Sequence, residues 1–259
     1  MMRTIRDTHV FFILLCICFS GQILVSCAHK SGPKHRNAPF GYSSGASNGY
    51  SSEYSREKSR QRDPVRTASG HGREKMDAAD IFRRYNSAVF MVLTTDGRNM
   101  YQGSGFFLDA HGLAVSNYHV FQGTGIGAEL IKVVGRDSYC KVSEILYRSK
   151  KYDFILFRVG IDCSNYIPIA ARKPSVGEKV FAIGSPRGLE NTFSSGEVSQ
   201  WRDSYLMQIS ALIDHGSSGG ALINEYGEAV GITSGTFYDG SQANLNYAWS
   251  MEAVKPYLP

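Results

Sequence analysis

The stretch GSGFFLDAHGLAVSNYHV, residues 103–120, holds two runs of apolar, β-branched and aromatic residues that meet at His111-Gly112. Short runs of this composition, joined by a glycine-containing turn, predict two antiparallel strands. The pattern recurs on both sides of the stretch, and two sets of six such runs predict an all-β fold of two six-stranded antiparallel β-barrels, closed or nearly closed. The first set comprises residues 88–95, 103–109, 113–120, 130–135, 139–147 and 153–159, and the second comprises 179–185, 192–202, 205–211, 221–227, 229–237 and 245–251.

The two sets of strands are separated near residues 168–177. The first barrel is therefore predicted over about 88–168 and the second over about 176–255, within a folded domain that covers 76–259 and has a cleft between the barrels. Residues 77–85 add a short N-terminal helix, because their apolar side chains share one helical face and acidic residues stand at the start.

The N-terminus has the pattern of a secretion signal, with arginines before the apolar run VFFILLCICF at residues 10–19. The following LVSC, which ends at Cys27, resembles a bacterial lipobox, whose cysteine is acylated and becomes the new N-terminus. We therefore predict a signal peptide over 1–27 and a lipid anchor at Cys27 that holds the protein in the cell envelope, in the periplasm or at the outer membrane. Ordinary cleavage after Ala28 and an uncleaved anchor helix are the alternatives, although a spanning helix needs about 20 apolar residues.

Residues 28–75 are poor in aliphatic residues and rich in Ser, Gly, Arg and Lys. Such a segment buries too little apolar surface to offset the entropy of ordering. We predict a disordered tether, and its tyrosines leave open a contact with cell-wall glycan or a partner. The tether carries much of the basic excess behind the net charge of +5. The domain itself has no basic stripe of the kind typical of nucleic-acid-binding proteins.

Only two of the five cysteines fall in the predicted domain, Cys140 and Cys163. In an oxidising compartment they could form a disulfide or stay as free thiols, and the sequence leaves both states open. No CxxC motif or His/Cys cluster is present in the sequence. We therefore expect neither a metal site nor a cofactor.

The motif Gly216-Ser217-Ser218-Gly219-Gly220 lies between two predicted strands. A serine hydroxyl is a poor nucleophile unless a base removes its proton, and it needs N–H donors for the developing oxyanion. The glycines allow the chain to turn so that backbone N–H groups converge. A flexible surface turn would have the same composition, so the motif needs catalytic partners elsewhere in the chain.

Two residues are candidates for those partners. His119 closes the run 113–120, and Asp153 opens an apolar strand, where a carboxylate needs a hydrogen-bonding partner. Taken singly, a structural histidine and a turn-capping aspartate would explain them. The chain order His119, Asp153, Ser218 is one of three known orders of the Ser-His-Asp triad and accompanies two-barrel folds. We therefore predict a catalytic triad that straddles the cleft.

The predicted domain resembles the protease domain of the HtrA/Deg family of trypsin-like (chymotrypsin-fold) serine peptidases. The resemblance is carried by four blocks in order: GSGFFLDAHGLAVSNYHV at 103–120, YDFIL at 152–156, AIGSPRGLENTFSSGEVS at 182–199 and QISALIDHGSSGGALIN at 208–224. It implies that a polypeptide is the substrate and that the active site lies in the cleft between the barrels.

The resemblance also implies a role for each site residue. Ser218 attacks the peptide carbonyl, His119 acts as general base and then general acid, and Asp153 fixes its tautomer. The N–H groups of Gly216 and Ser218, with Ser217 between them, form the oxyanion hole.

The sequence departs from the family pattern around the nucleophile. Ser217 and Asp214 stand where the family usually has Asn, Ser210 stands where it has Asp, and His215 occupies a variable position. These differences can alter the loop but remove no triad member. The family typically continues into PDZ domains, whereas this chain ends at Pro259. We therefore expect no PDZ-dependent regulation, and the oligomeric state stays open.

The substrate pocket is predicted by position in the same pattern. Leu212 is expected at its base and Thr233, Ser234, Gly235 and Ala248 along its walls, although Leu212 could equally be core. No acidic residue is expected at the base, which argues against cleavage after Lys or Arg and favours small or medium aliphatic residues.

Two functions from different classes remain. The first is an extracytoplasmic serine endopeptidase that cleaves unfolded or extended polypeptides in protein quality control or processing. The second is a catalytically latent module of the same fold that binds peptides or a partner protein without turnover.

Overall fold

The computed structural model describes residues 67–68, 74–125, 127–163, 165–185, 191–236 and 245–259. The predicted signal peptide, the lipidation site Cys27 and most of the predicted tether lie outside the described residues. None of the described helices is long and apolar enough to cross a membrane.

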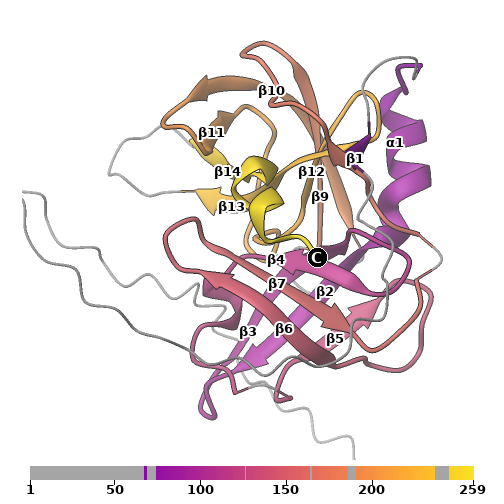
Figure 1. Cartoon of the computed structure of the whole chain (residues 1–259), viewed down its shortest axis with the longest axis vertical. Coiled ribbons are helices and arrows are strands. Elements are labelled where there is room, and N and C mark those ends of the chain that lie inside the picture. The colour runs from indigo at the N-terminus through magenta and orange to yellow at the C-terminus, as the bar shows by residue number, and fades with distance from the viewer. Residues whose placement is uncertain (1–66, 69–73, 126, 164, 186–190, 237–244) are drawn as a thin grey trace, which may run out of the picture.

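The described chain folds into two β-sheets, one above the other in Figure 1, that follow the two sets of strands expected from the sequence. The N-terminal sheet has six antiparallel strands in the order β5-β2-β3-β4-β7-β6. Its strands are β2 (Val89–Thr95), β3 (Met100–Phe107), β4 (Leu113–Ser116), β5 (Leu130–Val133), β6 (Val142–Ser149) and β7 (Phe154–Val159).

This first sheet is open, which departs from the closed or nearly closed first barrel that the sequence predicted. Among the described residues, the two edges of this sheet meet through an isolated antiparallel bridge between Ile131 of β5 and Cys140, which lies two residues before β6. β5 has four residues, and β6 shifts register between Val142 and Glu144, directly after the bridge. The two edges therefore diverge before a ladder can form between them.

The C-terminal sheet contains a closed six-stranded barrel, as predicted. Its order is β1-β8-β13-β12-β9-β10-β11-β14, and a further pairing of β13 with β14 closes the ring. The short strands β1 and β8 lie outside the ring and pair in parallel. β1 falls within the predicted tether, so at least two residues of that segment have a strand partner. The strands are β1 (Thr67–Ala68), β8 (Ile169–Ala170), β9 (Lys179–Gly184), β10 (Thr192–Trp201), β11 (Leu206–Ile209), β12 (Ala221–Asn224), β13 (Ala229–Thr236) and β14 (Asn246–Ser250).

The predicted N-terminal helix is present as α1 (Ala78–Tyr85). The Asp77 side chain caps it by accepting the Asp80 N–H at 2.7 Å, as expected for an N-cap aspartate. Ile81 and Tyr85 are buried in a core cluster that residues of both sheets share. Each sheet also encloses its own apolar core. The shared cluster fixes one sheet on the other and so fixes the geometry of a site between them.

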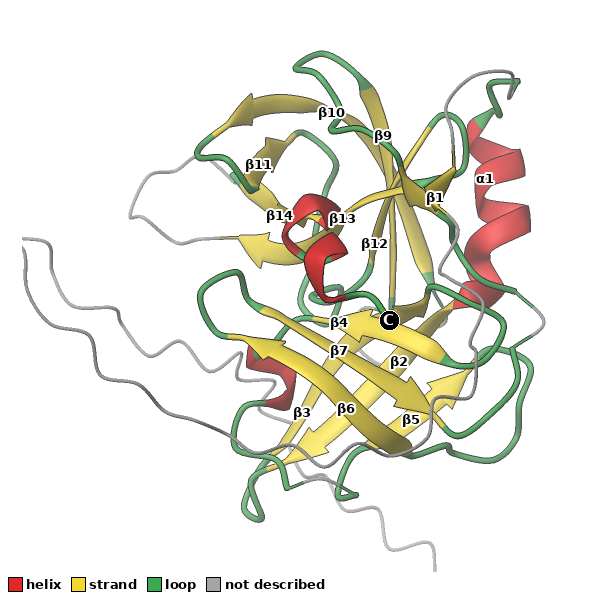
Figure 2. Cartoon of the chain, in the orientation of Figure 1, coloured by secondary structure: helices red, strands yellow, loops and turns green. Residues whose placement is uncertain are grey.

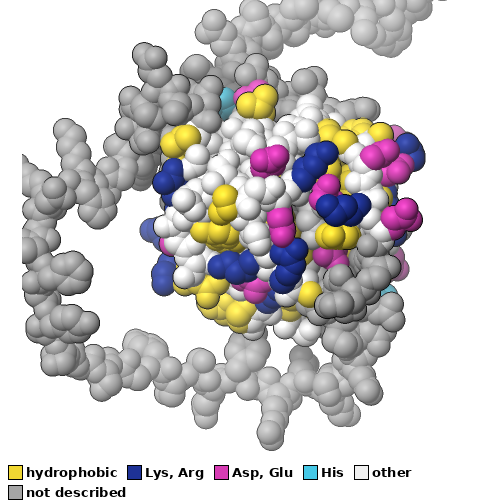
Figure 3. Space-filling model, turned by 90° about the horizontal axis from the view of Figure 1, so that it is seen from above, with side chains coloured by type: hydrophobic (Ala, Val, Ile, Leu, Met, Phe, Trp, Pro, Cys, Tyr) yellow, Lys and Arg dark blue, Asp and Glu magenta, His cyan; other side chains and the backbone are white. Residues whose placement is uncertain are grey.

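The remaining helical segments are single turns, shown with α1 in red in Figure 2. They are η1 (Asn86–Ala88), η2 (His119–Phe121), η4 (Met251–Ala253) and η5 (Lys255–Tyr257). The last two carry the C-terminal residues back into the shared core. On the face seen from above in Figure 3, basic and acidic side chains are interspersed, so this face has no broad single-sign field.

Candidate active site

His119 and Asp153 form a fixed pair at the first sheet. Strand β4 ends at Ser116, and His119 opens the turn η2 instead of continuing the strand as predicted. Its ring Nδ1 lies 2.7 Å from Asp153 Oδ2, and its backbone N–H donates to Asp153 Oδ1 at 2.9 Å. Because the carboxylate holds both the ring and the backbone of His119, it fixes the orientation of the imidazole. The second ring nitrogen is left for a reacting group.

Two further side chains fix Asp153. The Ser234 hydroxyl donates to Asp153 Oδ2 at 3.0 Å, and Asn117 Nδ2 donates to the Asp153 carbonyl at 2.8 Å. Ser234 was predicted as a wall of the substrate pocket, and its bond to the carboxylate was missed. β13 shifts register against β14 between Thr233 and Gly235. A bulge at this point re-aims the Ser234 side chain, which strand alternation alone does not predict.

The backbone of Asp153 adopts a left-handed conformation with φ +47°. Such a conformation costs roughly 1–2 kcal/mol for a residue with a side chain, so the surroundings must hold it. The Tyr152 ring packs on Tyr205 of the second sheet, with centroids 4.8 Å apart. The Phe154 ring packs on Tyr257 at the C-terminal turn at 5.9 Å. These flanking contacts hold Asp153 in place from both sides.

Ser218 lies in a turn that Ser104 of β3 supports from below. Ser104 N–H donates to the Ser218 carbonyl, and Ser104 Oγ donates to the Gly216 carbonyl, both at 2.7 Å. Gly216 and Gly219 both have positive φ, at +93° and +89°. A side-chain carbon on Gly219 would lie 2.1 Å from the Ser104 carbonyl oxygen. Glycine at position 219 is therefore required by the close approach of this turn to β3.

The close packing around Gly103 brings Ser218 next to the His119 turn. A side-chain carbon on Gly103 would lie 2.6 Å from both γ-carbons of Val120 and 3.1 Å from the Ser218 carbonyl oxygen. Val120 follows His119 in η2. The Ser218 turn and the η2 turn that carries His119 therefore both pack against Gly103 of β3.

The opposite side of the site is formed by β13. A side-chain carbon on Gly235 would lie 3.3 Å from Ser218 Oγ, and the preceding Ser234 is bonded to Asp153. All three predicted triad residues are thus gathered around one site. The hydrogen bonds of the described residues include the His119–Asp153 pair but none between Ser218 Oγ and His119.

The Ser218 turn also presents donors for an oxyanion. Within the described part of the chain, the N–H groups of Gly216 and Ser218 donate to no other residue. The Ser217 N–H donates to the Asp214 carbonyl at 3.0 Å, and the Ser217 carbonyl accepts the Thr233 hydroxyl at 2.7 Å. Ser217 therefore shapes the turn, and the two N–H groups on either side of it are left for a ligand.

The predicted substrate pocket is only partly assembled. The Leu212 side chain is 74 % exposed, so Leu212 is neither the base of an enclosed pocket nor core. Thr233 is buried and directed at Ser217, and Ala248 is buried in the core of the second barrel. Gly235 does lie beside Ser218. Leu212 is therefore an apolar residue exposed to solvent six positions before Ser218 in the chain.

Cys140 and Cys163 are free thiols in this structure, which leaves the disulfide unformed. Burial, with the nearby Asp109 carboxylate, raises the pKa of the Cys163 thiol to about 11. No group of three or more His, Cys, Asp or Glu side chains is placed to hold a metal ion among the residues that the structure describes.

Residues 103–232 match the family model of the trypsin-like peptidase domain. The chain is 32 % identical over 174 residues to the serine endoprotease DegS of Escherichia coli, an alignment that covers 60 % of this chain and 48 % of DegS. It is 34 % identical over 180 residues to the serine protease HTRA3 of Mus musculus, covering 60 % and 39 %. The chain thus spans about a third to just over half of the length of the curated relatives it matches.

Solved structures of serine proteases also match the fold of this chain. A serine endoprotease from Yersinia pestis matches with a TM-score of 0.60 and 26 % identity, covering 70 % of this chain and 65 % of that one. The active form of the Rv3671c protease from M. tuberculosis matches with a TM-score of 0.62 and 17 % identity, covering 78 % and 92 %, and supports the chymotrypsin-like fold. The chain therefore belongs to the trypsin-like peptidase family and carries a serine protease domain of the HtrA/Deg type.

Proposed function

We propose that this protein is a serine endopeptidase that cleaves unfolded or extended polypeptides outside the cytoplasm. The observation that carries the proposal is the His119–Asp153 pair, held at 2.7 Å, with Ser218 gathered at the same site. The two unbonded N–H groups of the Ser218 turn support it, because acyl transfer requires donors at the position of the oxyanion.

In the proposed reaction each group has its own step. Ser218 Oγ attacks the carbonyl carbon of the peptide bond, and the free ring nitrogen of His119 takes the hydroxyl proton. Asp153 stabilises the imidazolium that forms, and the N–H groups of Gly216 and Ser218 bind the oxyanion. The imidazolium then protonates the leaving amine, which breaks the C–N bond. Water, deprotonated by His119, hydrolyses the acyl-serine and restores the free hydroxyl.

Peptide binding without turnover is the second candidate function. It is favoured by two observations: the exposed Leu212 side chain, and the absence of a hydrogen bond between Ser218 and His119 among the described residues. If the protein is an endopeptidase, substrate binding must bring the Ser218 hydroxyl to the His119 imidazole and order the pocket. If it binds peptides without turnover, neither change takes place.

The cellular setting of the proposal comes from the N-terminal sequence. A secretion signal that ends at Cys27 supports a lipid anchor in the cell envelope, and the Ser/Gly-rich segment behind it supports a tether for the domain. Quality control or processing of envelope proteins fits this position. None of the predicted pocket residues, Leu212, Thr233, Ser234, Gly235 and Ala248, is itself acidic, which supports cleavage next to small or medium aliphatic residues.

Cleavage of unfolded casein tests the two functions against each other. Wild type and the control Ser199→Ala, which changes an exposed serine of β10, should cleave casein, and Ser218→Ala should not. Equal cleavage by wild type and Ser218→Ala would contradict the endopeptidase proposal. Casein binding without cleavage by any of the three proteins would instead establish the second function.

A further inference from the structure

The open side of the first sheet has a second polar feature beside the bridge between β5 and β6. The Glu129 carboxylate, only 1 % exposed, accepts the N–H of Gly127 at 2.8 Å and the N–H of Val142 at 2.9 Å. Glu129 precedes β5, and Val142 opens β6. The carboxylate therefore takes the place of a missing strand partner, and both of its oxygens are bonded within the protein.

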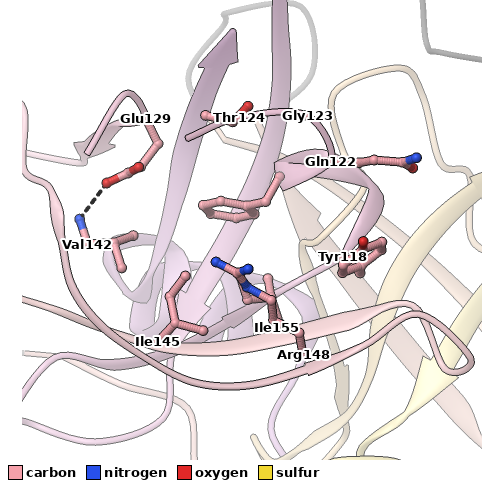
Figure 4. A pocket seen from close by; sticks show the side chains of 10 residues that line it. Tyr118, Gln122, Gly123, Thr124, Glu129, Val142, Ile145, Arg148 and Ile155 are labelled. Carbon is pink, nitrogen blue, oxygen red and sulfur yellow. Dashed lines mark hydrogen bonds between the residues drawn. The ribbon is translucent and has the colours of Figure 1, made fainter. Parts of the chain in front are cut away.

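A cavity of about 110 Å³ lies at this opening. Its wall includes the apolar side chains of Val142, Ile145 and Ile155, together with Phe121 of the turn η2. Figure 4 shows Glu129 at one side of the cavity and the Arg148 guanidinium near its middle. The cavity thus combines an aliphatic wall with one cationic group and one carboxylate, and both oxygens of that carboxylate are already bonded within the protein.

Arg148 lies at the rim of the cavity, where its side chain is exposed to solvent. In the β6–β7 ladder Arg148 stands directly opposite Ile155, and partners in an antiparallel pair point to the same face. Ile155 is buried in the core of the first sheet, and Figure 4 shows the Arg148 guanidinium close to it. Among the described residues, no carboxylate forms an ion pair with Arg148. A guanidinium in this position is matched to a ligand carboxylate, which it can bind with two parallel hydrogen bonds.

The cavity also touches the turn that carries His119. Tyr118 and Gln122 both line it, one on each side of η2. The Phe121 N–H donates to the Tyr118 carbonyl at 3.1 Å, and the Gln122 N–H donates to the His119 carbonyl at 3.2 Å. A molecule in the cavity therefore contacts the same hydrogen-bonded turn that positions the imidazole.

We propose that this cavity binds an aliphatic carboxylate, with the carboxylate on Arg148 and the aliphatic group against Ile145 and Ile155, and that its occupancy changes the setting of His119. A free branched-chain acid and the C-terminal residue of a peptide both have this chemistry. The binding site stands on its own geometry, and only the effect on catalysis rests on the proposed function. If that function holds, the peptides that the enzyme releases carry such chain ends, so the site would sense its products.

The test measures binding and the histidine separately, on the full chain. The probes are 4-methylpentanoate, its amide 4-methylpentanamide, and a short peptide that ends in leucine as the free acid or the amide. Calorimetry should give a dissociation constant on the order of 1 mM for the acids. Both amides, and both acids with Arg148→Gln, should bind at least about tenfold more weakly, since a charge-assisted hydrogen bond is lost. Arg202→Gln, which changes an exposed arginine of the second sheet, is the matched control and should bind like wild type.

The proton chemical shifts of the His119 ring, assigned with His119→Gln, report the effect on the turn. They should move on saturation with acid in wild type and stay fixed in Arg148→Gln. Equal affinity for acid and amide, or for wild type and Arg148→Gln, would overturn the site. Binding that leaves the His119 signals unmoved would overturn its link to the histidine. Because neither measurement requires catalysis, an inactive but acid-binding protein would refute the proposed function and keep this site.

Discussion

Ser104 should hold the nucleophile turn, and Ser104→Ala tests this directly. The Ser104 side chain is fully buried, and its hydroxyl donates to the Gly216 carbonyl at 2.7 Å and accepts the Ser185 N–H at 2.9 Å. Removing the hydroxyl leaves two buried backbone groups without their partner. Each such group costs about 1–3 kcal/mol, so the free energy of unfolding should fall by about 2–6 kcal/mol.

Urea unfolding followed by tryptophan fluorescence measures this loss. Both tryptophans, Trp201 and Trp249, lie in the second barrel, which the Ser185 bond joins to β3. The control is Ser143→Ala, an exposed serine of β6 that also bonds a carbonyl, and it should change stability by less than about 0.5 kcal/mol. A loss in Ser104→Ala no larger than in this control would refute the claim that Ser104 joins the two sheets beneath the active site.

Three further changes test other parts of the structure. Ser234→Ala removes the hydroxyl that donates to Asp153. For casein cleavage, kcat should fall about tenfold while KM stays unchanged, because one hydrogen bond to a charged group is lost. A tenfold rise in KM with kcat unchanged would contradict a role of Ser234 at the carboxylate. Glu129→Ala leaves the Val142 N–H unpartnered beside the open edge, so unfolding free energy should fall by about 2 kcal/mol, whereas Glu129→Gln keeps an acceptor and should lose less. The Cys163 thiol, with its pKa raised to about 11, should be only about one-thousandth thiolate at pH 8. Alkylation of Cys163 by iodoacetamide should therefore be slow at pH 8 and accelerate as the pH rises toward 11, and fast alkylation at pH 8 would show that the thiol is not buried.

The elements that depend on local pattern were predictable from the sequence. The strand runs and α1 follow from composition, periodicity and the acidic start of the helix, and each is present in the structure within a few residues. The pairing of His119 with Asp153 was also accessible, because an aspartate at the head of an apolar strand needs a partner. The glycines around Ser218 could be predicted to serve a tight turn, and their positive φ values agree.

The rest depends on contacts between distant segments. Closure of the first sheet is decided by the edges of β5 and β6, and strand composition does not report whether two edges meet. The bond from Ser234 to Asp153 arises from a bulge in β13 that strand alternation does not reveal. Leu212 was placed by motif position, which gives the order of residues along the loop but not the direction of a side chain. The partner of Thr67–Ala68 is about a hundred residues away in β8, beyond the reach of a local pattern.

Labelling by a fluorophosphonate tests the central claim most directly, because the probe reacts only with a serine activated by its base. Mass spectrometry of the labelled wild-type protein should find the phosphonyl group on Ser218, and His119→Ala should lose the label while it stays folded. Equal labelling of wild type and His119→Ala, or a label at another serine, would contradict the proposal that His119, Asp153 and Ser218 act as one catalytic unit.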